Sequence, residues 1–290
     1  MERESAPMME VRFENLSISA DIVVKDETQL KTELPSLSNV VKMEVLRLSA
    51  KNHAVKKQIL RNLSGVLTPG TMTLVLGQPG SGKSAFMKYL SGRFPMTNNI
   101  STEGNVTYNG KDHRGLRSKL PQFVSYVDQR DNHYPTLTVK ETFEFAHDCT
   151  GAKPSKWDEH CGTVESRPDI IIRQLGLENC QNTVVGDAVL RGVSGGEHKR
   201  VTTGEMAFGN QPMLMMDEVS TGLDSATTFD VISTQRNLAK EFNKTVVISL
   251  LQPSPQVFDL FDGVLLLKDG YVMYHGPRAE VVNYFEDLGF

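Results

Sequence analysis

A glycine-rich turn between an apolar run and a helical run constrains the fold of this chain more than any other feature. The turn fits the pattern G-x-x-x-x-G-K-[ST] at every fixed position, with the residues Gly77, Gln78, Pro79, Gly80, Ser81, Gly82, Lys83 and Ser84. Residues 71–76 before it are apolar and rich in strand formers, and residues 84–90 after it have helical spacing. A strand, a glycine turn and a helix in this order predict an α/β fold.

The chemistry of this turn points to a phosphate ligand. Glycines let the backbone bend so that N–H groups face an anion, and the helix N-terminus adds partial positive charge. Lys83 can reach the β- and γ-phosphates, and the Ser84 hydroxyl can bind Mg²⁺. We therefore expect residues 77–84, with Ala85, to bind a nucleotide. The alternative, a glycine turn with an incidental lysine, is disfavoured by the strand and helix beside it.

The remaining pattern predicts the organisation of the chain. Continuous apolar runs at 123–127, 213–216, 245–250 and 263–267 are typical of strands buried on both faces of a parallel sheet. Helical spacing covers 139–147, 169–177 and 199–208, and strands are expected at 43–48 and 59–67. We interpret residues 1–40 as a weakly ordered arm, residues 41–290 as one domain, and residues 149–168 as a surface insertion.

An acidic pair, Asp217 and Glu218, follows the apolar run at 213–216. In a phosphate-loop enzyme, the first carboxylate of such a pair holds Mg²⁺ directly or through water. Glu218 would then be placed to polarise the attacking water. The alternative is a strand that simply ends in solvent with acidic residues.

Composition excludes several classes of protein. The net charge of −4 and the pI of about 6.0 argue against a nucleic-acid binder. Three cysteines form no even framework, so a reducing compartment fits best. The N-terminus lacks the apolar stretch of a signal peptide, and no apolar run could span a bilayer. A membrane role would therefore come through a partner or through sequence beyond Phe290.

A third motif identifies a family. Ser194, Gly195, Gly196 and Glu197 form a turn that opens a helix, either as an anion site or as an ordinary N-cap at Ser194. With the phosphate loop and the acidic pair, this order resembles the ABC ATPases, whose signature motif reads closely like Val193–Glu197. The resemblance covers about residues 41–290. It implies a P-loop NTPase with a mostly parallel core sheet, an antiparallel β subdomain, an inserted α-helical subdomain at about 130–210, and ATP and Mg²⁺ as cofactors.

The roles of Gln129 and of residues 220–225 follow only from that resemblance. Gln129 is similar to the Q-loop glutamine, which touches Mg²⁺ and the attacking water; the alternative is a polar loop residue. Catalysis is then expected from Lys83, Gln129 and Glu218, and metal binding from Ser84, Gln129 and Asp217. Residues 220–225 resemble the D-loop, which crosses a dimer interface, or they form a helix N-cap turn. The resemblance also implies that the signature motif of each cassette completes the nucleotide site of the other cassette.

Residues 200–206, 216–225, 250–253 and 274–290 resemble the G subfamily, above all the first cassette of full-size pleiotropic-drug-resistance transporters. This implies a second ABC cassette as partner and a transmembrane domain C-terminal to Phe290. It also implies a place at the cytosolic face of a membrane, and export. The transported substrate is chosen by membrane helices and is not readable here.

One position departs from the family pattern. Most active cassettes carry a histidine that contacts the γ-phosphate where this chain has Leu251. The site is therefore expected to bind ATP and turn it over slowly. The alternative is a nucleotide-gated dimerisation module with little hydrolysis of its own. A soluble ABC ATPase of translation or DNA repair would need a tandem cassette, a coiled-coil insertion or basic patches, and a kinase or GTPase is disfavoured by the signature turn.

Other residues are expected to have ordinary roles. His53 is the nearest candidate to stack on adenine, but an exposed loop histidine is the better interpretation. The spacing of His147, Cys149, His160 and Cys161 matches no common zinc site. Phe143, Phe145 and Trp157 are interpreted as packing residues.

Overall fold

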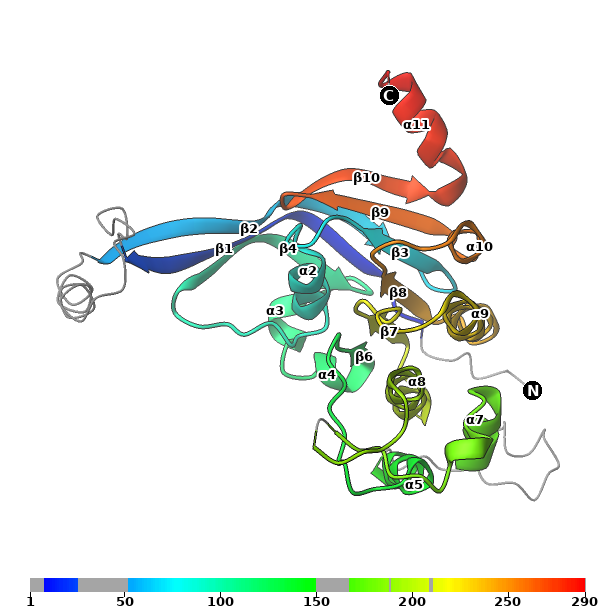
Figure 1. The fold of residues 1–290 in the computed structure, drawn as a ribbon. Coiled ribbons are helices and arrows are strands. Elements are labelled where there is room, and N and C mark those ends of the chain that lie inside the picture. Colours follow the sequence, from blue (N-terminus) through cyan, green and yellow to red (C-terminus); the bar gives the residue numbers. More distant parts are fainter. Residues whose placement is uncertain (1–7, 26–51, 150–166, 188, 209–210, 290) are drawn as a thin grey trace, which may run out of the picture.

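The computed structural model describes residues 8–25, 52–149, 167–187, 189–208 and 211–289. Two β-sheets form the middle of the molecule, with helices α5, α7 and α8 at one end and the C-terminal helix α11 at the other (Figure 1). Among the described residues, no helix combines the length and the apolar content that a membrane span needs.

The larger sheet has six strands in the order β10-β9-β3-β8-β7-β6. They are β3 Met72–Leu76, β6 Val124–Val127, β7 Met213–Met216, β8 Thr245–Ser249, β9 Gly263–Lys268 and β10 Tyr271–Pro277. All neighbours pair in parallel except β10, which runs antiparallel to β9. The apolar runs predicted as buried strands form four of the parallel strands, so the predicted mostly parallel sheet is confirmed.

Helices cover both faces of this sheet. The longer ones outside the inserted group are α2 Lys83–Leu90 and α9 Ser225–Glu241, and the short ones are α3 His113–Leu116, α4 Leu120–Phe123, α10 Pro255–Phe258, η3 Arg278–Glu280 and α11 Val281–Asp287. Successive side chains of a strand point to opposite faces. Val75 accordingly packs in one core cluster with Phe86 of α2, whereas Leu74 packs in another with Ile232 of α9.

The smaller sheet is antiparallel, in the order β2-β1-β4-β5. Its strands are β1 Val11–Lys25, β2 Asn52–Leu67, β4 Ile100–Tyr108 and β5 Lys111–Asp112. β1 pairs with both β2 and β4, and it packs Phe13 against Phe86 with ring centroids 5.1 Å apart. The predicted antiparallel β subdomain is confirmed, with β2 as its expected strand at 59–67.

The interpretation of residues 1–40 as a weakly ordered arm is wrong for Val11–Lys25, which form strand β1. The inward side chains Val11, Phe13, Leu16 and Ile18 are fully buried, but their spacing is not strictly alternate. The register shifts between Phe13 and Leu16, where Asn15 has a φ of 53°. This bulge restores Leu16 to the buried face, and the same irregularity hides the strand in the sequence. Residues 1–7 and 26–40, and the strand expected at 43–48, lie outside the described residues.

A group of helices follows β6 in the chain and has its own core. It contains α5 Val139–Cys149, α7 Arg167–Gln174, η1 Glu178–Cys180, α8 Gly195–Glu205 and η2 Met206–Phe208. A Cβ on Gly204 would lie 2.3 Å from Cζ of Phe143, so α8 and α5 pack together closely at this point. Phe143 is buried as expected, but Phe145 is 57% exposed, and its interpretation as a packing residue is wrong. Trp157 lies outside the described residues.

Candidate functional site

The predicted phosphate loop connects β3 to α2 as its sequence requires. Gly80 and Gly82 have φ values of 83° and 101°, in the left-handed region that glycine adopts without strain. A Cβ on Gly82 would lie 2.6 Å from Cδ2 of Leu60, so this position also needs glycine for space. The N–H of Ser81 donates to the carbonyl of Gln78 at 3.1 Å and closes the turn around Pro79.

Lys83 folds back over this loop. Its side chain is 3% exposed, and Nζ donates to the carbonyl oxygens of Gly77 at 2.7 Å and Gln78 at 3.3 Å. An ammonium group has three protons, so one donor remains for a ligand. The Ser81 hydroxyl is buried and has no hydrogen-bond partner. A buried hydroxyl without a partner is costly unless a ligand satisfies it. Ser84 and Ala85 lie in the first turn of α2, where backbone N–H groups have no partner within the helix.

The acidic pair lies at the carboxyl end of β7. Strand β7 is not a direct neighbour of β3 in the sheet, because β8 lies between them. The Glu218 side chain spans that gap, with Oε1 3.6 Å from Nζ of Lys83. The structure therefore brings the phosphate loop and the acidic pair together at one edge of the sheet, although their strands are not neighbours.

Asp217 is held by two hydroxyl groups that sequence reasoning missed. The Tyr126 hydroxyl donates to Oδ2 at 3.0 Å, and the Ser249 hydroxyl donates to Oδ1 at 2.7 Å. Burial, with the charge of Asp217 next, raises the pKa of Tyr126. Its phenol therefore stays a donor, and each carboxylate oxygen keeps a lone pair for a metal ion. Ser249 is the last residue of β8 and lies at the same edge of the parallel sheet as Asp217. Its position at the end of a predicted strand is the feature that could have identified it from the sequence.

Glu218 sits in a backbone conformation that non-glycine residues rarely adopt, with a φ of 49°. Its N–H donates to the Ser249 hydroxyl at 2.8 Å and to the Ser249 carbonyl at 3.1 Å. The side-chain amide of Gln129 donates to Oε2 at 2.7 Å. Neighbouring strands thus hold the turn that aims the Glu218 carboxylate, and the structure brings Lys83, Gln129 and Glu218 together.

The Ser194–Glu197 turn lies apart from this group. The N–H of Glu197 donates to the Ser194 hydroxyl at 3.3 Å, and the N–H of Ser194 donates to Oε2 of Glu197 at 2.7 Å. The bond from the Ser194 N–H to the carboxylate lowers the pKa of Glu197, and the two bonds together form a capping box at the start of α8. The N-cap role considered for Ser194 is confirmed. Among the described residues, no hydrogen bond or ion pair joins this turn to the phosphate loop.

The D-loop-like segment and Leu251 follow the strands as expected. Asp224 accepts a hydrogen bond from the N–H of Thr227 at 2.8 Å and caps α9, so the considered N-cap role is confirmed. Hydrogen bonds from Thr227 lower the pKa of Asp224. Leu251 follows β8 and is 42% exposed, close in sequence to Ser249 of the acidic site.

The remaining candidates lie largely outside the described residues. The side chain of His53, and both His160 and Cys161, lie outside what the structure describes. Among the described residues, no group of three or more histidine, cysteine and acidic side chains could hold a metal ion.

Comparison with known proteins places this geometry in a family. The family model described as ABC transporter matches residues 60–221, which include the phosphate loop, the Ser194–Glu197 turn and the acidic pair. The chain is 40% identical over 322 residues to "ABC transporter G family member 31" of Arabidopsis thaliana. The aligned region covers 98% of this chain and 22% of that protein. The chain is 39% identical over 323 residues to "ABC transporter G family member 51" of Oryza sativa subsp. japonica, with 98% and 21% covered. It is 37% identical over 317 residues to "Pleiotropic drug resistance protein TUR2" of Spirodela polyrhiza, again with 98% and 21% covered.

The predicted resemblance to the G subfamily and to pleiotropic-drug-resistance transporters is confirmed. The chain spans about a fifth of the length of the curated relatives that it matches. With a P-loop fold, the family's ordered motifs and a family model over more than half of its residues, the chain belongs to the ABC transporter family.

Proposed function

We propose that this chain binds Mg-ATP at residues 77–85 and hydrolyses it together with a second ABC cassette, to power transport across a membrane. The observation that carries the proposal is the meeting of three side chains at one sheet edge. Nζ of Lys83 lies 3.6 Å from Oε1 of Glu218, and the Gln129 amide lies 2.7 Å from Oε2. Such a cation, amide and carboxylate beside a glycine loop suit the cleavage of a phosphoanhydride.

The donor set also fits a magnesium ion. Hard oxygen ligands suit Mg²⁺, and Asp217, Gln129 and Ser84 supply a carboxylate, an amide and a hydroxyl near the loop. Both oxygens of Asp217 are oriented by hydroxyl donors, with lone pairs to spare. When bound, Mg²⁺ would neutralise negative charge on the phosphate oxygens. We assign Ser84, Gln129 and Asp217 to it.

Each of the other side chains has a distinct role in this proposal. Lys83 directs its remaining proton to the β- and γ-phosphates, and the loop N–H groups with the Ser81 hydroxyl bind the β-phosphate. Glu218 accepts a proton from the attacking water as general base. Gln129 donates to Oε2 of that carboxylate, so Oε1, which makes no hydrogen bond to a described residue and lies 3.6 Å from Nζ of Lys83, accepts the proton.

The second cassette is needed because the Ser194–Glu197 turn lies apart from the phosphate loop in the same chain. We propose that this turn completes the site of the partner and that the partner's turn completes this one. Gly195 supports the proposal, because a Cβ there would meet no atom within 4 Å and the start of α8 is open. A capping box leaves other N–H groups of the first turn available to an anion.

The transport role is proposed from relatives that carry the name transporter. We propose a transmembrane domain, following Phe290, as the partner that the cassette drives at the cytosolic face of a membrane, with export as the direction. No nucleic acid is proposed as a partner, because the chain carries a net charge of −4.

Leu251 favours slow turnover at this site and keeps a second candidate function in view. An exposed leucine cannot donate a hydrogen bond to the γ-phosphate, and loss of one such donor costs about 10²- to 10³-fold in rate. The second candidate is a nucleotide-gated dimerisation module with little hydrolysis of its own. Both candidates share the ATP site and differ only in whether Glu218 works as a base.

Glu218→Gln in the assembled transporter tests the proposal. If Glu218 is the base, ATP hydrolysis attributable to this site should fall about 10²- to 10⁴-fold while ATP affinity persists. Leu251→His, which offers the missing donor, should raise that rate. An ATPase rate that neither variant changes would leave the dimerisation module as the better account.

A further inference from the structure

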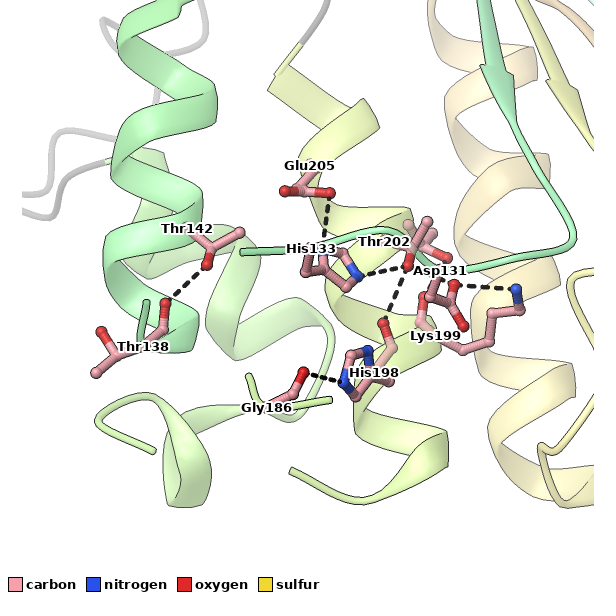
Figure 2. A network of polar contacts seen from close by, with 10 residues as sticks. Asp131, His133, Thr138, Thr142, Gly186, His198, Lys199, Thr202 and Glu205 are labelled. Carbon is pink, nitrogen blue, oxygen red and sulfur yellow. Dashed lines mark hydrogen bonds and ion pairs between the residues drawn. The ribbon is translucent and has the colours of Figure 1, made fainter. Parts of the chain in front are cut away.

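A polar network ties the segment after β6 to helix α8 (Figure 2). Alternate residues of the segment, Gln129, Asp131 and His133, meet residues of α8 that are spaced by three. Those helix residues are Lys199, Thr202 and Glu205. Residues three apart lie on the same face of a helix, so one face of α8 matches every second residue of the segment.

Lys199 makes the contact nearest to the acidic site. Its side chain is 3% exposed, and Nζ donates to the backbone carbonyl of Gln129 at 2.6 Å and to Oδ1 of Asp131 at 3.0 Å. These two acceptors lie on either side of Arg130. The ammonium therefore clamps the backbone at the residue whose amide donates to Glu218.

The rest of the network fixes the same segment at two more points. The Thr202 hydroxyl donates to Oδ1 of Asp131 at 2.6 Å, and its oxygen lies 2.9 Å from Nε2 of His133. With the hydroxyl proton directed to Asp131, Nε2 is the donor of the second bond. Nδ1 of His133 lies 3.3 Å from Oε2 of Glu205 without a hydrogen bond between them, and the His133 side chain is 1% exposed, so its bonded contact with α8 is the one to Thr202. The segment thus has three anchors on α8.

We infer that Lys199 is a positioning residue for Gln129: by holding the Gln129 carbonyl, it sets where the Gln129 amide meets Glu218. This inference rests on the proposed function of Gln129 and Glu218. Lys199 does not contact the reacting groups itself. Because Lys199 belongs to the helix that begins with the Ser194–Glu197 turn, displacement of that helix shifts the Gln129 amide as well.

Lys240 offers a matched control. Its Nζ donates to the carbonyl of Gly70 at 3.0 Å and forms an ion pair with Asp262 at 2.9 Å. It therefore also joins one carbonyl and one carboxylate from different elements, but it has no contact with Gln129. Lys199→Met and Lys240→Met each remove such a clamp, and only the first should affect Gln129.

The first measurement follows the Gln129 side-chain amide in the 290-residue chain by NMR, with Gln129→Asn to assign the signal. Lys199→Met should increase solvent exchange of that amide at least about tenfold, because the hydrogen bond to Glu218 opens more often. Lys240→Met should leave it unchanged. Equal exchange in wild type and Lys199→Met would overturn the inference, whatever the fate of the proposed hydrolysis.

The second measurement is ATP hydrolysis by the assembled transporter, with Glu218→Gln as reference. Lys199→Met should lower kcat about 10- to 100-fold, as displaced catalytic groups do, with KM for ATP within about twofold. In a Gln129→Ala background it should add less than about twofold, because the two act as a unit. A full additional loss in that background, or a kcat equal to that of Lys240→Met, would contradict a role through Gln129. If Glu218→Gln itself has no effect, the proposed function fails and the amide exchange still decides the role of Lys199.

Discussion

Lys83 and Lys199 are both buried lysines, but the molecule compensates their charges differently. Lys199 has a carboxylate oxygen at 3.0 Å and a carbonyl at 2.6 Å. Lys83 has two carbonyls, and its nearest carboxylate oxygen lies at 3.6 Å. Beside Lys83 a buried Ser81 hydroxyl has no partner, whereas the hydroxyl beside Lys199 is bonded. A fully compensated lysine holds the fold in place, and an incompletely compensated one is available to an anion.

The largest effect on folding is expected at Lys199. Lys199→Met leaves the Asp131 carboxylate, 22% exposed, without its cation. Removing one partner of a buried pair costs about 3 kcal/mol or more of the free energy of unfolding. Urea denaturation of the 290-residue chain measures it. The Lys240 side chain is 46% exposed, so Lys240→Met should lower the free energy of unfolding less than Lys199→Met does. A smaller loss for Lys199→Met than for Lys240→Met would contradict the stronger role of the buried ion pair.

His113 extends the comparison to a buried basic group without a compensating carboxylate bond. Burial, with the charge of Arg117 next, lowers the pKa of His113 to about 4 from 6.5. Below pH 6.5 the His113 ring binds a proton in the unfolded chain but stays neutral in the folded one. The contribution of His113 to the free energy of unfolding is therefore fully present above pH 6.5 and is lost as the pH falls toward 4. Between pH 7 and pH 5, protonation of this one group should lower the free energy of unfolding by about 2 kcal/mol.

Denaturation of wild type and His113→Gln at both pH values isolates this contribution, because other groups titrate in both proteins. On acidification from pH 7 to pH 5, the free energy of unfolding of the variant should fall by about 2 kcal/mol less than that of wild type. An identical loss would mean that the folded ring accepts a proton despite its burial.

A smaller effect is expected at the start of α8. Ser194→Ala removes the oxygen that accepts from the N–H of Glu197. Loss of an N-cap costs about 1 kcal/mol of the free energy of unfolding. If the turn also serves a partner's site, ATPase of the assembled transporter should fall by more than this stability change explains. Ser254→Ala, which removes the cap of α10, is the control, because Ser254 has the same bond to Val257.

The smallest folding effect is expected at Lys83. Lys83→Met should change the free energy of unfolding by less than about 1 kcal/mol, because the lost hydrogen bonds are offset by removal of a buried charge. Thermal denaturation without nucleotide tests this. A loss as large as that of Lys199→Met would show that Lys83 is part of the structural framework.

Motifs that depend on local sequence could be predicted, and contacts that depend on distant pairing could not. The glycine turn at 77–84 was predicted correctly between a strand and a helix, because glycine conformation and both elements are encoded within a few residues. Tyr126 and Ser249 were missed because they lie 91 and 32 residues from Asp217 and look like ordinary strand residues.

Strand β1 was missed for a related reason. A bulge at Asn15 breaks the alternation of buried side chains, and the partner strand β4 begins only at Ile100. The position of β8 between β3 and β7 is also a property of topology rather than of any one segment. Sequence therefore predicted the fold class and several residues that the fold brings to one sheet edge, but not the side chains that orient them.

The loop that holds Lys83 is proposed as an ATP site. The most direct test of this proposal is equilibrium binding of Mg-ATP to the 290-residue chain and to Lys83→Met, with Lys199→Met as the comparison. Loss of a charge-assisted contact of about 1.5 to 3 kcal/mol should weaken binding about 10- to 100-fold in Lys83→Met, and Lys199→Met should bind like wild type. Equal affinity of wild type and Lys83→Met for Mg-ATP would contradict the account.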